Sequence, residues 1–230
     1  MRKFGSMARN LVVGAASLVC ISAPAMAEEF SWSVTGAATS DYIFRGVSLN
    51  DEDPAFQASI DASYGIFYAG IWGSMISDIY EPVELDLYAG IKPELGPVTF
   101  DFGFVYYIYP WGDHPSDLSV IELKAGASYS PVDKLTLKPV YWYVPDQENS
   151  DEISTLEGTV AYELPTVGIF TPTISGLYGW TEAAGEYEYW NAGLSLGVEK
   201  FTFDFRYWDT DLDSDLADER FVFTASVTLP

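Results

Sequence analysis

The sequence contains one cysteine, Cys20, and one histidine, His114, among its 230 residues. Cys20 falls in a segment that we expect to be removed, so the rest of the chain is predicted to carry no disulfide and no cysteine metal site. A single histidine, in an irregular loop, also argues against a transition-metal centre and against a serine–histidine pair. We therefore predict no cofactor, no metal site and no enzymatic activity.

Basic residues are also scarce. The chain has 11 Lys and Arg against 34 Asp and Glu, which gives a formal net charge of −23. Nucleic-acid binding requires a basic face, so this composition excludes it. An acidic surface of this strength gathers cations and repels anions.

Long apolar runs are absent after residue 27, where none reaches the roughly 18 residues of a membrane helix. The first 27 residues combine a basic start, an apolar stretch over 11–21 and an A-x-A site that ends at Ala27. That combination predicts a secretory signal peptide over 1–27, followed by one domain over 28–230. In a membrane, only a closed barrel could satisfy the backbone of such a domain.

Segments with a period of two residues are present instead, as in 99–104 and 202–207. A period of two predicts β-strands. We predict twelve strands, over residues 30–46, 55–64, 66–75, 83–92, 98–109, 119–129, 135–144, 153–164, 169–180, 188–199, 201–208 and 219–229.

The connections between these strands alternate between two kinds. One set is short, and the other is longer and acidic, at 47–54, 76–82, 110–118, 145–152, 181–187 and 209–218. Outer-membrane barrels have this asymmetry, with short periplasmic turns and longer external loops. We therefore predict an all-β fold, a transmembrane antiparallel up-and-down barrel of about twelve strands in a Gram-negative outer membrane.

The alternation also assigns the two faces of the sheet. We expect apolar residues to face lipid and tyrosine and tryptophan residues near strand ends to form interface girdles. The predicted lumen-facing charges are Asp41, Arg45, Asp61, Glu84, Asp86, Asp101, Glu122, Lys124, Lys138, Asp204 and Arg206. These charges either line a polar conduit or form an ion-pair network that fills a narrow barrel.

An acidic mouth is predicted at Asp209, Asp211, Asp213 and Asp215. Their spacing is similar to that of a calcium loop, but the sixth and twelfth positions hold Ser214 and Arg220 rather than Gly and Glu. The pattern is therefore not an EF-hand. A looser divalent site that bridges acidic loops or lipopolysaccharide phosphates stays open beside a plain solvated loop.

Residues 39–48 (TSDYIFRGVS), 53–55 (DPA) and 65–74 (GIFYAGIWGS) resemble the opening of the TorF family of bacterial porins. The resemblance implies an outer-membrane barrel and a channel, without naming a solute. With the first strand extended to residue 46, Tyr42 and Phe44 are expected at the lipid interface. Asp41 and Arg45 are then expected inside, as a charge pair at the mouth.

The function predicted from the sequence is passive diffusion of small hydrophilic solutes, cationic or neutral, across the outer membrane. The expected partners are outer-membrane lipid, lipopolysaccharide and those solutes. The main alternative is a non-conducting structural or adhesive barrel whose acidic loops bind cations. A membrane-embedded enzyme and a soluble secreted barrel are further alternatives, and the oligomeric state is left open.

Overall fold

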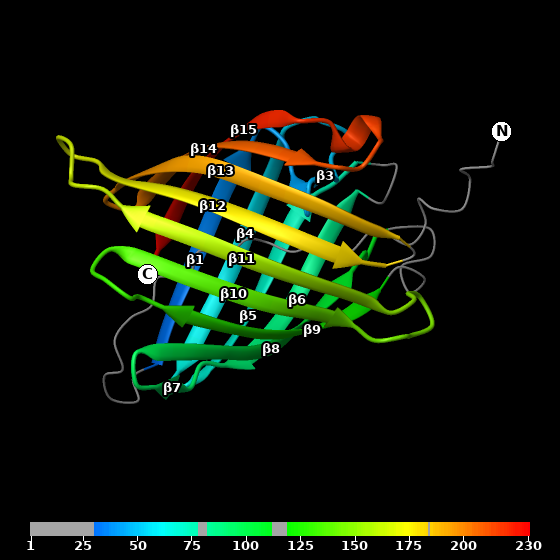
Figure 1. The fold of residues 1–230 in the computed structure, drawn as a ribbon, viewed down its shortest axis with the longest axis horizontal. Helices are drawn as coiled ribbons and strands as arrows, with labels where there is room; N and C mark the ends of the chain where they lie inside the picture. The colour runs from blue at the N-terminus through cyan, green and yellow to red at the C-terminus, as the bar shows by residue number, and fades with distance from the viewer. Residues whose placement is uncertain (1–29, 78–81, 112–118, 184) are drawn as a thin grey trace.

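The computed structural model describes residues 30–77, 82–111, 119–183 and 185–230, which fold into a closed barrel (Figure 1). The predicted signal peptide, with Cys20, and His114 lie outside the described residues. No helix in the part of the chain that the structure describes is long and apolar enough to cross a membrane.

Twelve strands of nine to thirteen residues form the wall, within these described ranges. Each is antiparallel to its neighbours along the chain, and the first pairs with the last, which closes the ring and confirms the predicted fold class. They are β1 (Phe30–Thr39), β4 (Ala55–Tyr64), β5 (Phe67–Met75), β6 (Val83–Ile91), β8 (Val98–Ile108), β9 (Val120–Tyr129), β10 (Leu135–Val144), β11 (Ile153–Glu163), β12 (Thr171–Glu182), β13 (Glu186–Val198), β14 (Phe201–Thr210) and β15 (Arg220–Leu229).

Three short elements accompany the wall. β7 (Glu94–Leu95) pairs with the start of β8, and a 3-10 helix, η3 (Asp215–Ala217), lies between β14 and β15. β2 (Ile43–Phe44) and β3 (Val47–Ser48) pair only with each other, in a separate two-stranded sheet. This pair and the residues beside it, over 41–50, form what we call the inner hairpin.

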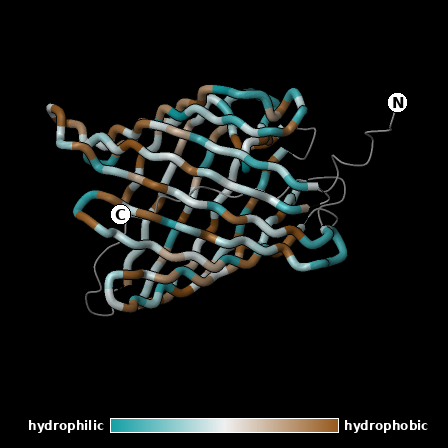
Figure 2. Tube along the Cα trace, in the orientation of Figure 1, coloured by the Kyte–Doolittle hydropathy of each residue, from teal (hydrophilic) through white to brown (hydrophobic). Residues whose placement is uncertain are grey.

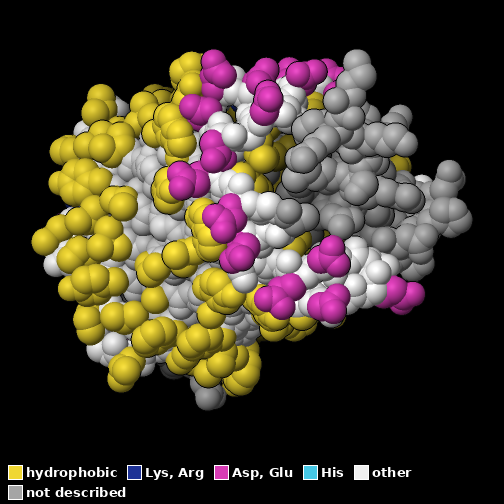
Figure 3. Space-filling view, turned by 45° about the vertical axis from the view of Figure 1, so that its right-hand side comes forward, with side chains coloured by type: hydrophobic (Ala, Val, Ile, Leu, Met, Phe, Trp, Pro, Cys, Tyr) yellow, Lys and Arg dark blue, Asp and Glu magenta, His cyan; other side chains and the backbone are white. Residues whose placement is uncertain are grey.

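Side chains alternate between the two faces of the wall, as the period of two predicts. On β6, Glu84 and Asp86 are buried inside, whereas Leu87, the next residue after Asp86, is exposed on the outside. Hydrophilic and hydrophobic residues therefore interleave along the strands (Figure 2). The outer face exposes large apolar side chains over much of its surface, and the acidic side chains gather toward one end (Figure 3).

The two ends of the barrel differ in their connections. The turn-bearing end holds the start of β1, the end of β15 and short turns such as that at Gly65, which has a φ of +57°. The loop-bearing end holds the longer connections, including 40–54, 145–152 and 211–219. The predicted loop over 181–187 is shorter than expected, because β12 and β13 stay paired up to Glu182 and Glu186. In the same way, β14 continues to Thr210, so Asp209 lies in a strand.

The first predicted strand, over 30–46, is wrong at its end. β1 stops at Thr39, whose hydroxyl donates to the carbonyl of Asp41 at 2.7 Å, and the chain then turns into the barrel. Tyr42 and Phe44 are only 4% and 6% exposed, so they pack inside rather than at a lipid interface. A longer strand would leave these residues at the rim, whereas the inward turn buries them among apolar wall residues.

Candidate functional site: the barrel interior

The inner hairpin fills the interior at the loop-bearing end. Its tip is the two-residue turn Arg45–Gly46, with φ values of +47° and +85°. Positive φ at both central residues is the geometry of the tight turns that close two-residue hairpins. A side chain at Gly46 would lie 3.0 Å from Cβ of Thr210, so the wall approaches the tip closely. The tip therefore projects Arg45 into the interior.

The guanidinium of Arg45 is held by a carboxylate on the wall. Its Nη2 donates to Oε1 of Glu122 at 2.7 Å, and both side chains are almost fully buried. The other oxygen of Glu122 accepts from the hydroxyl of Tyr107 at 2.8 Å. The guanidinium also lies over the Phe44 ring at 4.7 Å and near the Trp142 ring at 6.0 Å. Aromatic faces attract cations, so the rings add to the ion pair.

A second wall carboxylate, Glu157, lies on the same side of the interior as Arg45, because the Trp142 side chain contacts both. Its two oxygens accept hydrogen bonds from the indole of Trp142 at 2.8 Å and the hydroxyl of Tyr189 at 2.6 Å. Neither of these donors carries a positive charge. One guanidinium therefore lies near two carboxylates, and the ammonium of Lys124, which pairs with Asp101, lies over the Trp142 ring at 5.3 Å as a second cation nearby.

Glu84 and Asp86 lie along the same inner face of β6. Glu84 accepts from the hydroxyl of Tyr42, on the hairpin, at 2.9 Å and from that of Tyr109 at 2.8 Å. Asp86 is 2% exposed, and its Oδ1 has no hydrogen-bond partner. A buried carboxyl oxygen without a hydrogen-bond partner is costly, so Asp86 is the least well satisfied polar group on this face.

Nearer the turn-bearing end, the interior charges pair across neighbouring strands. Lys124 contacts Asp101 at 2.6 Å, and Asp101 also accepts from the hydroxyl of Tyr68 at 2.7 Å. Lys92 lies over the ring of Tyr68 at 4.7 Å. These groups are half-buried rather than enclosed, so this part of the interior is more accessible than the part around the hairpin.

On the opposite side of the barrel, the guanidinium of Arg206 is held by four hydrogen bonds. Its guanidinium contacts both carboxylate oxygens of Asp204, at 3.0 and 2.9 Å, and also donates to Asn191 at 2.6 Å and Ser175 at 3.0 Å. Bidentate pairing of this kind fixes the geometry of an arginine. We regard Arg206 as a structural part of the wall.

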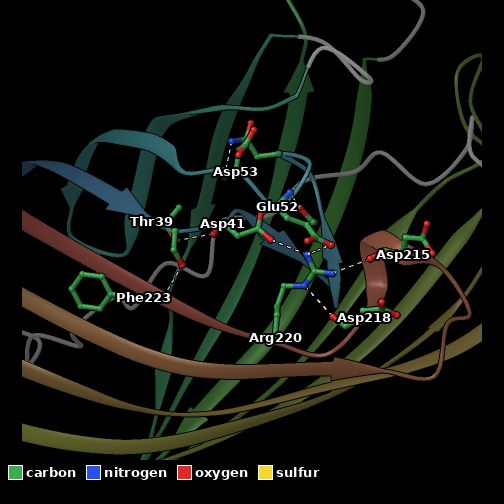
Figure 4. Close-up of polar contacts among 11 residues, drawn as sticks. Thr39, Asp41, Glu52, Asp53, Asp215, Asp218, Arg220 and Phe223 are labelled. Atoms are coloured by element: carbon green, nitrogen blue, oxygen red, sulfur yellow. Dashed lines mark hydrogen bonds and ion pairs between the residues drawn. The ribbon is translucent and has the colours of Figure 1, made fainter.

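Arg220 anchors the base of the inner hairpin (Figure 4). Its Nη1 contacts Asp41 at 3.1 Å and Glu52 at 3.2 Å. Its other nitrogens donate to the backbone carbonyls of Asp218 at 2.9 Å and Asp215 at 3.2 Å. Burial raises the pKa of the Asp41 carboxyl, against the hydrogen bonds from Ser48 and Arg220, which lower it. The base is thus tied to β15 and to η3.

All eleven interior charges predicted from the sequence are buried or half-buried. Asp61 accepts from the hydroxyls of Tyr88 and Ser59, and Lys138 lies half-buried on β10. Asp41 and Arg45 are brought in by the inner hairpin rather than by β1, so the expected charge pair at the mouth does not form between them. The role of these charges in a conduit stays a prediction.

The four predicted mouth residues lie in different local surroundings, and their role as a mouth stays a prediction. Asp209 lies within β14, while Asp211 accepts from the backbone N–H of Glu188 at 2.7 Å. Asp213 and Asp215 are exposed. No group of three or more acidic, histidine or cysteine side chains is arranged for a metal ion in the ranges that the structure describes.

Sequence reasoning missed the aromatic partners of the interior carboxylates, namely Tyr42, Tyr107, Tyr109, Trp142 and Tyr189. Four of the five stand on inner parities of strands that were predicted, so the alternation could have identified them. The Arg45–Gly46 pair was the available signal for the hairpin, because Gly readily adopts the left-handed backbone of a tight turn.

The fold is shared with solved porins. The KdgM porin, in a structure "in complex with disordered oligogalacturonate", superposes with a TM-score of 0.61 at 10% identity, covering 86% of this chain and 98% of that chain. The NanC porin gives a TM-score of 0.54 at 11% identity, covering 87% of this chain and all of that one. Similarity at such low identity establishes the barrel fold alone.

No curated protein matches the sequence. Neither these porins nor the matching family model carries the name TorF, so that resemblance stays a prediction. A family model does match over residues 23–228, nearly the whole chain. The chain therefore belongs to the family described as "Bacterial protein of unknown function (Gcw_chp)".

Proposed function

We propose that this protein is an outer-membrane channel of Gram-negative bacteria, exported by a signal peptide over residues 1–27. The membrane location is supported by the outer face, which exposes large apolar side chains such as Phe56, Phe102, Leu156 and Phe223. Soluble monomers rarely expose contiguous apolar patches above a few hundred Å². A closed barrel leaves no unpaired strand edge in lipid.

The observation that carries the channel proposal is the charged interior of a twelve-stranded ring. Barrels of eight strands are filled by their own side chains, and barrels of sixteen leave a wide aqueous channel. Twelve strands fall between these limits. Half-buried charges farther from the hairpin, such as Lys124 in the middle of β9 and Asp101 toward the turn-bearing end, support a wetted interior there.

The proposed solutes are small, hydrophilic and cationic or neutral. The buried and half-buried interior groups include eight acids and six bases, when Glu157, Lys92 and Arg220 are added to the predicted set. The loops add further Asp and Glu side chains at the loop-bearing end (Figure 3). This balance would disfavour an acidic polymer such as the oligogalacturonate bound by the KdgM porin.

Swelling of proteoliposomes tests the proposal. Lysine, glutamine and glutamate are similar in size and differ in charge, so they separate charge preference from exclusion by size. We expect faster swelling in lysine and glutamine than in glutamate. Faster entry of glutamate would overturn the charge preference, and entry of none of them would overturn the channel proposal.

One observation favours the second candidate, a non-conducting barrel. The inner hairpin packs Tyr42, Phe44 and Leu49 into an apolar cluster with wall residues at the loop-bearing end. A barrel filled in this way could serve as a structural or adhesive unit whose acidic loops bind cations or lipopolysaccharide. The absence of swelling from correctly folded protein would support this candidate.

A further inference from the structure

The wall around the tip of the inner hairpin has the composition of a cation-binding site. Glu122 and Glu157 supply two carboxylates, and Trp142 supplies an aromatic ring that Arg45 and Lys124 both approach. Tyr107 and Tyr189 orient the carboxylates by donating hydrogen bonds to them. These five residues, which we call the wall site, come from β8, β9, β10, β11 and β13.

The present occupant of the wall site is a guanidinium that the chain itself supplies. Arg45 contacts Glu122 through one nitrogen only, and its Nε is buried without a hydrogen-bond partner. Arg206 shows how a structural arginine is satisfied in the same barrel, since it makes a two-point contact with Asp204 and two further hydrogen bonds. A buried guanidinium with an unused donor is held less firmly.

The tip is also attached differently from the base. At the base, Arg220 binds Asp41 and Glu52, and backbone hydrogen bonds join Ser40 to Phe223 and Ser77 to Leu49. At the tip, the polar connection to the wall is made by the side chain of Arg45. Loss of this one side chain would therefore open the wall site while the base stays anchored.

We propose that the wall site binds organic cations that carry a guanidinium or primary ammonium group, and that Arg45 occupies it as a tethered competitor. The assignment of such cations as solutes rests on the proposed channel function. The binding site itself does not, because it follows from two carboxylates and an aromatic ring facing one incompletely bonded guanidinium. Solutes of this class would exchange with the Arg45 side chain as they pass the hairpin.

Binding of free guanidinium to the Arg45→Ala variant tests this inference. The substitution removes the tethered cation and leaves the wall site empty, so free guanidinium should bind there. We expect guanidinium to block potassium current through Arg45→Ala at a concentration about tenfold or more below that needed for the wild-type protein, as a charge-assisted hydrogen bond allows. Arg45→Lys keeps a tethered cation and should respond like the wild-type protein.

The double variant Arg45→Ala/Glu122→Gln provides the matched control, because it lacks one carboxylate of the wall site. It should lose most of the added sensitivity to guanidinium. Equal sensitivity of Arg45→Ala and the wild-type protein, or of the single and double variants, would overturn the inference.

A second readout does not depend on conduction. Millimolar guanidinium chloride should raise the temperature at which folded Arg45→Ala converts to the unfolded gel form, relative to the same concentration of sodium chloride. It should not do so for the double variant. If guanidinium stabilises Arg45→Ala but no variant conducts current, the result would support the wall site and contradict the channel. If the variants conduct current but guanidinium neither stabilises nor blocks Arg45→Ala selectively, the result would contradict the wall site and support the channel.

Discussion

The substitution Leu194→Arg should destabilise the barrel in a bilayer much more than a substitution to arginine near the turn-bearing end, such as Phe201→Arg. Leu194 lies in the middle part of β13, points outward and is paired with Ile174 and Phe205, which are also exposed and apolar. In a membrane, a lipid-facing arginine at this depth costs roughly 2–4 kcal/mol. On a water-exposed face, the same change would stay within about 0.5 kcal/mol. The magnitude therefore distinguishes a membrane barrel from a soluble one.

Phe201→Arg is the matched control. Phe201 is the first residue of β14, at the turn-bearing end, and is 49% exposed on the outer face. Arginine near an interface costs only about 0–1 kcal/mol. Urea unfolding of both variants in lipid vesicles measures the difference. A penalty for Leu194→Arg no larger than that for Phe201→Arg would refute the lipid-facing assignment.

The remaining predictions concern folding, the inner hairpin and one turn. Unboiled protein should migrate differently from boiled protein on SDS gels, because a closed ring has no edge strand from which to unzip; identical migration would contradict a stable closed barrel. Gly46→Cys/Thr210→Cys should lower stability in its reduced form, because position 46 has a φ of +85° and its Cβ would lie 3.0 Å from Cβ of Tyr189. The Cβ positions of 46 and 210 lie 3.0 Å apart, so a disulfide should form after a shift of the tip, and the oxidised form should conduct less than the reduced form; equal conductance would show that hairpin movement does not limit flow. Glu199→Gly should stabilise the barrel by up to about 1 kcal/mol in urea unfolding, because Glu199 has a φ of +53° that costs a side chain roughly 1–2 kcal/mol; Glu199→Ala, which keeps the strain, should show no such gain.

The wall of the barrel could be predicted from the sequence because each strand has one polar and one apolar face. Even in 66–75, where apolar residues occupy both parities, the two faces separate: Ile71 is exposed outside and Trp72 is buried inside. Trp72 could not be assigned from hydropathy because its partner is Tyr42, whose ring centroid lies 5.3 Å away on the inner hairpin. That contact depends on tertiary structure.

The inner hairpin could not be predicted by the same reasoning. Residues 41–46 continue the alternation of β1, so periodicity alone extends the strand through them. The turn inward depends on the Thr39 hydroxyl, on two left-handed residues at the tip and on the ion pair between Arg45 and Glu122, 77 positions apart. Strand pattern reports local backbone geometry, whereas this hairpin is stabilised by distant side chains.

The most direct test of the central claim is the reversal potential of the refolded protein in a planar bilayer with a potassium chloride gradient. The account predicts channels that prefer potassium over chloride at about 0.1 M salt and lose much of that preference at about 1 M, because the screening length falls from about 10 Å to about 3 Å. Replacing Asp209, Asp211, Asp213 and Asp215 with Asn should reduce the preference at low salt and leave the conductance at high salt nearly unchanged. Preference for chloride, selectivity that does not change with salt, or no channels from correctly folded protein would contradict the account.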